Sequence, residues 1–223
     1  MIATSVRTLA KRWLVARHRR TFPFEHYQRR HGCLFIHIPK TAGTSILEAL
    51  GKRGTGRLHL PWYVYWTADP FYFQKAWKFA FVRNPWDRVR SAWLYLMAGG
   101  NQREDLSMRA VLHSFGSFEQ FVINGLGTGA FRNHLLFIPQ AEFVCGPDGG
   151  PIVDFLGRYE TLEQDFTTVA QRLALTKRLP ARNVTKPQSR LLHDQPWTSR
   201  AIDVVGSIYA QDVTQFGYRA PLG

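Results

Sequence analysis

Two short apolar runs, each followed by a turn and a helical pattern, constrain the fold of this chain most strongly. Residues 33–38 are almost continuously apolar and lead into the turn-like segment 39–45. Residues 79–82 form a second such run, followed by Asn84 and Pro85, a favourable N-cap and a favourable first helical residue. Strands that are apolar throughout are typical of parallel sheets covered by helices. The sequence therefore predicts an α/β fold with a central parallel sheet flanked by helices.

Further elements are expected along the rest of the chain. Apolar spacing and cap residues predict a first helix from residue 46 to Gly51 or Gly54. They also predict helices over residues 85–97, 117–122, 161–175 and 202–217, and a third strand over residues 152–156. The segment 180–196 is polar and is expected to be mostly irregular.

Length and charge divide the chain into a basic segment and one domain. With 223 residues, the chain is long enough for a single domain with its own core. Residues 1–31 carry eight Lys or Arg and one acid, a formal charge of +7 that leaves +6 for the remaining 192 residues. We expect residues 1–31 to form a basic, amphipathic helical segment that docks on the protein or contacts an anionic membrane. Residues 32–223 are expected to be the functional domain.

The formal net charge of +13 predicts an anionic partner without saying which one. Nucleic acid is the less favoured partner, because over half of the excess charge lies in residues 1–31 and no recognition motif is present. No apolar run approaches the ~18–20 residues that a membrane span needs, and basic residues interrupt the start of the chain. Cys33 and Cys145, without CxxC spacing, are expected to be reduced thiols. We therefore expect a cytoplasmic protein, with peripheral membrane contact as the alternative.

The segment 39–45 has the composition of a phosphate-binding turn. Backbone N–H groups at the start of the following helix favour an anion, Gly43 lets the backbone approach a ligand closely, and Lys40 adds a positive charge. The hydroxyls of Thr41, Thr44 and Ser45 can donate hydrogen bonds. A small-molecule kinase is one enzymatic interpretation of such a turn. The segment lacks the GxxxxGK[ST] signature of P-loop NTPases, which counts against a kinase.

A second anion-binding station is predicted at the next strand-to-helix junction. Arg83 ends the strand 79–82, and Ser91 follows about two helical turns later, a rise of ~10 Å. Arg binds phosphate oxygens through a planar fork, and serine adds a hydroxyl donor. Two stations at one sheet edge suggest a ligand with two separated phosphate-like groups. Arg88 and Arg90 are expected to be solvated or to face an acidic substrate.

Four segments of the chain resemble one enzyme family. FIHIPKTAGTS (35–45) and FVRNPWDRVRSAW (81–93) resemble the nucleotide signatures of sulfotransferases, specifically the carbohydrate O-sulfotransferase (sulfotransferase family 2-like) branch. FLGRYETLEQDF (155–166) and IYAQDVTQFGY (208–218) are similar to later elements of that branch, so the resemblance covers about residues 33–219. It implies a P-loop-like, doubly wound fold. It also implies transfer of a sulfuryl group from 3′-phosphoadenosine 5′-phosphosulfate (PAPS) to a hydroxyl, on a carbohydrate or another acceptor, without a metal.

The resemblance also implies roles for individual residues. Arg83 and Ser91 match the pair that binds the 3′-phosphate of PAPS, and Lys40 is also expected to stabilise the leaving phosphate oxygen. The loop residues that match the holder of the 5′-phosphosulfate are Lys40, Thr41, Gly43, Thr44 and Ser45.

His59 is the expected catalytic base. It follows the first predicted helix, where similar carbohydrate sulfotransferases carry their catalytic histidine, and histidine titrates near neutrality. Asp69 or Glu104 is the alternative base. His37, inside the first apolar run, is expected to be a core histidine with satisfied hydrogen bonds.

Two further segments have open interpretations. Asn183 and Lys186, in the late polar segment, are expected to close over the nucleotide. A group of aromatic residues can either line the acceptor site or pack on the core: Trp62, Tyr63, Tyr65, Trp66, Phe71, Tyr72, Phe73 and Trp77.

Overall fold

The computed structural model describes residues 22–54, 56–100, 103–176, 179–180 and 196–221. The chain folds as two compact units. Unit 1 combines residues 1–83 with residues 140–182, and unit 2 combines residues 84–139 with residues 183–223. The chain therefore leaves unit 1 after Arg83 and returns to it at Gln140.

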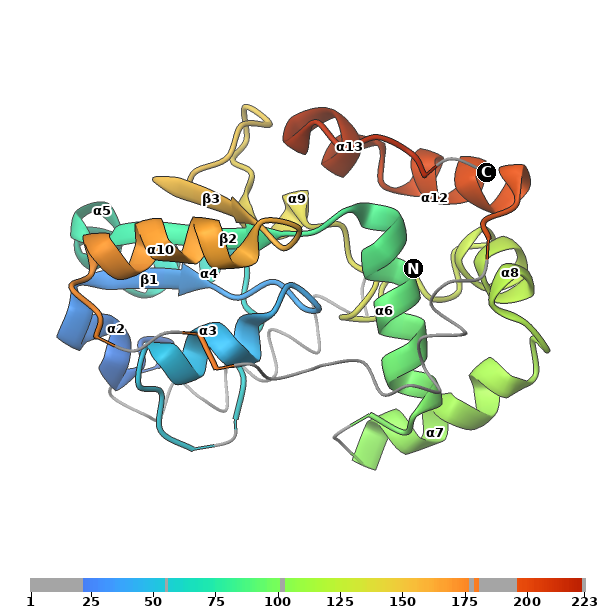
Figure 1. Ribbon diagram of the computed structural model, residues 1–223, viewed down its shortest axis with the longest axis horizontal. Helices are drawn as coiled ribbons and strands as arrows, with labels where there is room; N and C mark the ends of the chain where they lie inside the picture. Colours follow the sequence, from blue (N-terminus) through green and yellow to red (C-terminus); the bar gives the residue numbers. More distant parts are fainter. Residues whose placement is uncertain (1–21, 55, 101–102, 177–178, 181–195, 222–223) are drawn as a thin grey trace. The chain divides into compact units, whose positions relative to one another are not determined.

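Unit 1 contains a three-stranded parallel sheet in the order β1-β2-β3 (Figure 1). The strands are β1 (Cys33–Ile36), β2 (Trp77–Val82) and β3 (Phe155–Arg158). The described helices of unit 1 are α2 (His26–His31), α3 (Gly43–Ala49), α4 (Trp62–Ala68), α5 (Pro70–Lys75), α9 (Ala141–Val144) and α10 (Leu162–Arg172). A parallel sheet flanked by helices confirms the predicted α/β class.

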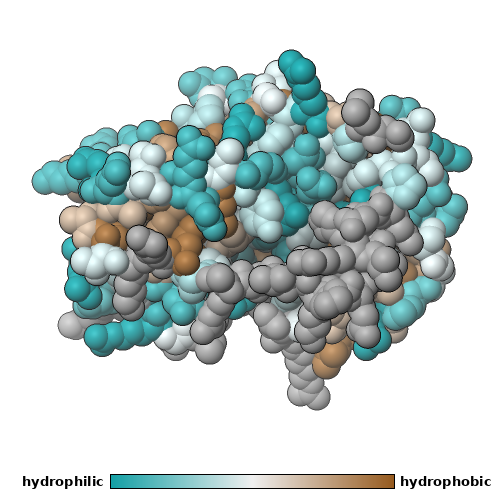
Figure 2. Space-filling model, viewed as in Figure 1, coloured by the Kyte–Doolittle hydropathy of each residue, from teal (hydrophilic) through white to brown (hydrophobic). Residues whose placement is uncertain are grey.

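Helices cover both faces of this sheet. On one face, alternate strand residues point the same way and pack against α3 and α10, which Figure 1 draws beside the strands. On the other face, the ammonium of Lys78 of β2 lies 5.5 Å from the ring centre of Phe73 on α5. Figure 2 shows a mostly hydrophilic surface, with apolar side chains gathered on unit 1 between α10 and α3. Members of the core on the first face are Phe35, Ile46, Leu50, Phe79, Phe81, Phe166 and Val169.

The third strand begins later than predicted. A bridge between Cys145 and Pro151 and a hydrogen bond from Ile152 N to Val144 O hold the chain in a tight return up to residue 152. Pairing with β2 becomes possible only after this return, and Asp154 N donates to Lys78 O at 2.8 Å. The prediction of a strand over residues 152–156 was therefore wrong in its limits, although its place in the chain was right.

Residues 22–31 pack into unit 1. Phe24 and Tyr27 are buried, and Glu25 forms an ion pair with Lys52. Gly32 caps the C-terminus of α2 in a left-handed conformation with φ of 60°. The predicted amphipathic helix lies within residues 1–21, outside the described part of the chain, so the division of the chain at residue 31 stays a prediction.

Deleting residues 1–20 is expected to leave cooperative unfolding intact, because the described core begins at Phe24. Deleting residues 1–31 is the matched comparison, since it also removes Phe24 and Tyr27. The loss of one large buried aromatic side chain costs about 3–5 kcal/mol, so the longer deletion should abolish or strongly weaken the transition. Urea unfolding followed by circular dichroism measures both. Loss of the transition in the shorter deletion would show that residues 1–20 belong to the core.

Unit 2 is helical in its described residues. Its elements are α6 (Pro85–Met97), α7 (Arg103–His113), α8 (Phe118–Gln120), the π-helix η1 (Phe121–Leu126), α12 (Ser199–Ile208) and α13 (Ala210–Phe216). Apolar side chains of α6, η1 and α12 share one core, which includes Trp86, Trp93, Phe121 and Val205. In the described residues, no helix has both the length and the apolar character that crossing a bilayer would require.

The cap residues of unit 2 act as the sequence predicts, with two differences. The side chain of Asn84 accepts a hydrogen bond from Trp86 N at 3.0 Å, and α6 spans the predicted residues 85–97. Ser117 accepts from Gln120 N at 3.1 Å, but the helix continues past its predicted end as η1. The predicted closing helix is divided into α12 and α13 at Tyr209, whose buried hydroxyl donates to Phe137 O.

Candidate functional site

The loop between β1 and α3 has an unusual backbone. Lys40 and Ala42 have positive φ values of 69° and 65°, a left-handed conformation that costs energy for residues other than glycine. Such strain is concentrated at ligand-binding and catalytic sites. The hydroxyl of Thr41 donates to Ile38 O at 2.9 Å in the interior, which fixes the turn. Thr41 therefore stabilises the loop. We predicted that its hydroxyl donates to the ligand, whereas in the structure it donates to a backbone carbonyl of the protein.

The other predicted loop residues have different exposures. Lys40 and Thr44 are half-buried, while Gly43 and Ser45 are buried. The amide N–H of Ser45 donates to Ala42 O at 3.0 Å, which closes the first turn after the loop. The structure thus brings the predicted lysine, glycine and hydroxyls together in one short turn at the end of β1.

Gly43 is required by a side chain of the protein itself. A Cβ at this position would collide with the imidazole of His37, which occupies the space above Gly43. We expected a ligand to lie close to the backbone of Gly43. In the structure the ring of His37 lies there instead. The ring also lies against Phe35, with centroids 5.4 Å apart.

His37 is a buried and neutral histidine at the start of this loop. Burial, followed by the positive field of His59, Arg57 and Lys52, lowers the pKa of His37 well below its usual 6.5. Its Nδ1 has no hydrogen-bond partner among the described residues, so the expectation of a satisfied core histidine was wrong. His37 also lies one residue beyond β1, not inside the strand.

His59, the predicted base, is held against His37. Nδ1 of His59 lies 2.9 Å from the carbonyl oxygen of His37, and the two ring centroids are 4.0 Å apart. Because a carbonyl oxygen can only accept a hydrogen bond, Nδ1 must carry the proton. In the neutral ring, Nε2 is then the basic nitrogen. The structure therefore connects His59 to the loop through His37, a residue whose part in the site the sequence did not reveal.

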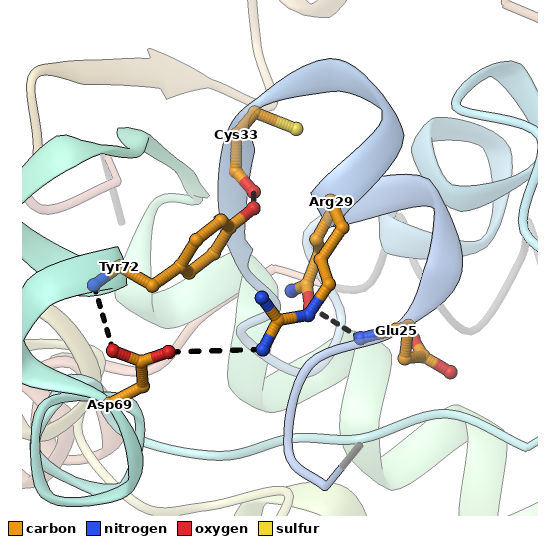
Figure 3. Close-up of polar contacts among 6 residues, drawn as sticks. Glu25, Arg29, Cys33, Asp69 and Tyr72 are labelled. Carbon is orange, nitrogen blue, oxygen red and sulfur yellow. Dashed lines mark hydrogen bonds and ion pairs between the residues drawn. The ribbon is translucent and has the colours of Figure 1, made fainter.

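Asp69, the first alternative base, has a structural role. Figure 3 shows its carboxylate between two partners of unit 1. One oxygen accepts from Tyr72 N at 2.9 Å and caps α5, and the other lies 3.8 Å from a guanidinium nitrogen of Arg29. The hydroxyl of Tyr72 in turn donates to Cys33 O at 3.1 Å. Glu104, the second alternative, belongs to α7 in unit 2, and its side chain lies outside the described residues.

Arg83 follows the last residue of β2 and is largely buried, with 8% of its surface exposed. Its guanidinium carbon lies 4.0 Å from the centre of the Tyr159 ring. Its backbone N–H and C=O both pair with the side-chain amide of Gln140, at 2.8 Å each. Ser91, its predicted companion, is half-buried on α6 of unit 2.

Arg88 and Arg90 are buried, contrary to the expectation that they are solvated. The guanidinium of Arg88 donates to Ile138 O at 2.6 Å and to Leu136 O at 3.3 Å. That of Arg90 lies 4.4 Å from the ring centre of Trp197. Both arginines are therefore part of the interior of unit 2, and neither forms an acidic-substrate surface.

A comparison with models of protein families gives a match for this chain. The model described as "Sulfotransferase family" matches residues 65–219, which is more than half of the chain. The chain belongs to the sulfotransferase family. Searches of curated proteins and of solved structures found no significant match.

The sulfotransferase match covers some of the predicted site and not the rest. Arg83, Ser91 and Tyr159 lie inside the matched residues. The loop 39–45 and His59 precede them, so their roles rest on the sequence and the geometry of unit 1. Enzymes of this family transfer a sulfuryl group to a hydroxyl-bearing acceptor and generally use PAPS as the donor.

The other residues predicted to contribute to the sulfotransferase site either differ in exposure or lie outside the described part of the chain. Asn183 and Lys186 fall in the undescribed segment 181–195. Within the part of the chain that is described, no group of three or more His, Cys, Asp or Glu residues could hold a metal ion. The aromatic residues differ in exposure. Tyr65 and Phe73 are buried in unit 1, and Tyr63, Trp66 and Phe71 are exposed. The other three, Trp62, Tyr72 and Trp77, are half-buried.

Proposed function

We propose that this sulfotransferase transfers a sulfuryl group from PAPS to a carbohydrate hydroxyl, with His59 as the base, on a P-loop-like, doubly wound form of the α/β fold. The observation that carries the proposal is the hydrogen bond between His59 Nδ1 and His37 O. It leaves the basic nitrogen of His59 at Nε2, beside a residue whose ring lies on Gly43 of the loop. Base and loop are thus in one unit and in contact through one residue.

The residues of the loop and of the β2 end fit a donor with two anionic groups. Lys40 supplies a cation to the 5′-phosphosulfate, and the hydroxyls of Thr44 and Ser45 supply donors. Arg83 supplies a planar set of N–H donors to the 3′-phosphate. The assignment of Ser91 to the same phosphate rests on the sequence resemblance alone. The positive φ values of Lys40 and Ala42 support this assignment, since they mark a loop whose conformation is imposed by the fold.

His59 and Lys40 divide the chemistry between proton and leaving group. Nε2 of His59 accepts the proton of the acceptor hydroxyl, and the His37 carbonyl stabilises the resulting imidazolium through Nδ1–H. When bound, PAPS supplies the sulfuryl group, which passes to the acceptor oxygen as the bond from sulfur to the 5′-phosphate oxygen breaks. The ammonium of Lys40 stabilises the negative charge on that phosphate oxygen.

Exposed aromatic residues support a carbohydrate as the acceptor. The helix α4 begins three residues after His59 and carries Tyr63 and Trp66, of which 44% and 39% are exposed. The indole N–H of Trp62 donates to Cys145 O at 2.8 Å and fixes the start of α4. Flat aromatic faces beside polar groups are suited to pack against sugar rings.

Adenosine 3′,5′-bisphosphate is expected to raise the Tm of the protein far more than AMP or ATP with Mg²⁺. The reason is that only the bisphosphate offers a 3′-phosphate to Arg83. Charge-assisted hydrogen bonds contribute about 1.5–3 kcal/mol, so Arg83→Ala should weaken bisphosphate binding by roughly 10- to 100-fold. Thermal shift and titration calorimetry measure the two effects.

Arg109→Ala is the matched control for this experiment. It removes the same charge from an exposed position on α7 and should leave the binding of adenosine 3′,5′-bisphosphate and of AMP unchanged. Equal stabilisation by AMP and by the bisphosphate in the unchanged protein would remove the 3′-phosphate station from the proposal.

A further inference from the structure

Arg83 is held from two sides inside unit 1. Its backbone is bound by Gln140, and its guanidinium lies over the ring of Tyr159. Neither Gln140 nor Tyr159 was assigned a role from the sequence. Both contacts fix an arginine at the position where β2 ends.

Gln140 takes the place of a missing strand partner. Up to Val82, the backbone of β2 is paired, since Tyr159 N donates to Val82 O at 2.8 Å. One residue later, Arg83 N donates to Oε1 of Gln140 and Nε2 of Gln140 donates to Arg83 O. Buried backbone groups need such partners. Gln140 is fully buried at the start of α9, so both ends of this clamp are fixed.

Tyr159 is fixed in the same way. Besides its bond to Val82, it follows Arg158, whose N–H donates to the carboxylate of Asp165 at 2.7 Å. The same carboxylate accepts from the hydroxyl of Thr161 at 2.8 Å, which closes the turn after β3. The ring of Tyr159 is therefore presented on a rigid turn. A cation 4.0 Å from a ring centre is within the range of a favourable cation–π interaction.

We propose that Tyr159 and Gln140 are positioning residues that preorganise Arg83 for the 3′-phosphate of the donor. This inference rests on the proposed function, because it assigns Arg83 that ligand. A mobile arginine side chain loses conformational entropy on binding, and a side chain that is already ordered loses less. The N–H donors of a guanidinium lie in its plane, so a ring against its face leaves them available to a phosphate.

The test compares Kd values for adenosine 3′,5′-bisphosphate and for AMP by titration calorimetry. Tyr159→Leu removes the ring face and keeps an apolar side chain, and it should weaken bisphosphate binding by about 3- to 30-fold. Tyr159→Phe keeps the ring and should stay within about twofold of the unchanged protein. AMP binding should be the same in all three. In the Arg83→Ala background, Tyr159→Leu should have no further effect on either nucleotide.

Three results would overturn the inference. The first is unchanged bisphosphate binding in Tyr159→Leu; the second is an equal loss for AMP, which would indicate general damage. The third is a full loss on top of Arg83→Ala. If Tyr159→Leu does not fold, Gln140→Met removes both hydrogen bonds at similar volume and should give the same selective loss. If Arg83→Ala alone leaves bisphosphate binding unchanged, the proposed function itself loses its 3′-phosphate site, and this outcome is distinct from the first three.

Discussion

Replacing His59 by alanine is expected to lower kcat by about 10²–10⁴-fold, the usual contribution of a positioned proton acceptor. The affinity for adenosine 3′,5′-bisphosphate should stay nearly unchanged, because the proposed mechanism assigns Nε2 of His59 to the acceptor hydroxyl. The loss should therefore appear in kcat and not in the donor KM. Labelled sulfuryl donor with a panel of carbohydrate acceptors measures kcat, and calorimetry measures the affinity.

Two variants make this result specific. His113→Ala removes an exposed histidine from α7 and should leave kcat unchanged. Lys40→Ala should lower both donor affinity and kcat, because its ammonium serves the bound phosphosulfate and the leaving oxygen. If His59→Ala keeps more than about a tenth of the turnover at saturating donor, His59 is not the base. Glu104 is then the next position to replace, since Asp69 is engaged in capping α5.

Replacing Arg88 by alanine is expected to lower the free energy of unfolding by about 2–5 kcal/mol. The guanidinium is fully buried and donates to the carbonyls of Leu136 and Ile138. Each buried polar group left without a partner costs about 1–3 kcal/mol, and the removed side chain also leaves a cavity. Urea unfolding followed by circular dichroism gives the difference.

Arg88→Lys and Arg109→Ala complete the comparison. Lysine keeps the charge but cannot reproduce a planar pair of donors, so it should be destabilising by an intermediate amount. Arg109 is exposed on α7, and its loss should change stability by less than about 0.5 kcal/mol. If Arg88→Ala were as stable as Arg109→Ala, the two carbonyls would have to find other donors, and Arg88 would have no structural role.

The sequence predicted those parts of the fold that depend on neighbouring residues alone. Asn84 and Pro85 fix the start of α6 through a side-chain cap and a preset φ, both of which are properties of those residues alone. The limits of β3 depend instead on the return between Cys145 and Pro151. Such a return is set by contacts between distant backbone groups, which apolar spacing does not reveal.

In the candidate site, too, local features could be predicted from the sequence and contacts between distant residues could not. The composition of the loop 39–45 singled out Lys40, Gly43 and the hydroxyls as candidates, and their binding role stays a prediction. The burial of Arg88 was missed because its partners lie 48 and 50 residues away and are backbone carbonyls, which every residue possesses. His37 was taken for a core residue, and only its contacts with Gly43 and His59 reveal its place in the site.

The paired hydrogen bonds between Arg83 and Gln140 also bear on how this chain can vary in length. They join the two points at which residues 84–139 depart from the sheet unit and come back to it. A segment whose ends meet can be lengthened, shortened or exchanged without shifting the register of β2 against β3, since the cost of closing a longer loop rises only slowly. Insertions and deletions in the loops between these two residues, outside the core of unit 2, should therefore leave the sheet of unit 1 intact, provided that the glutamine amide at the point of return is kept.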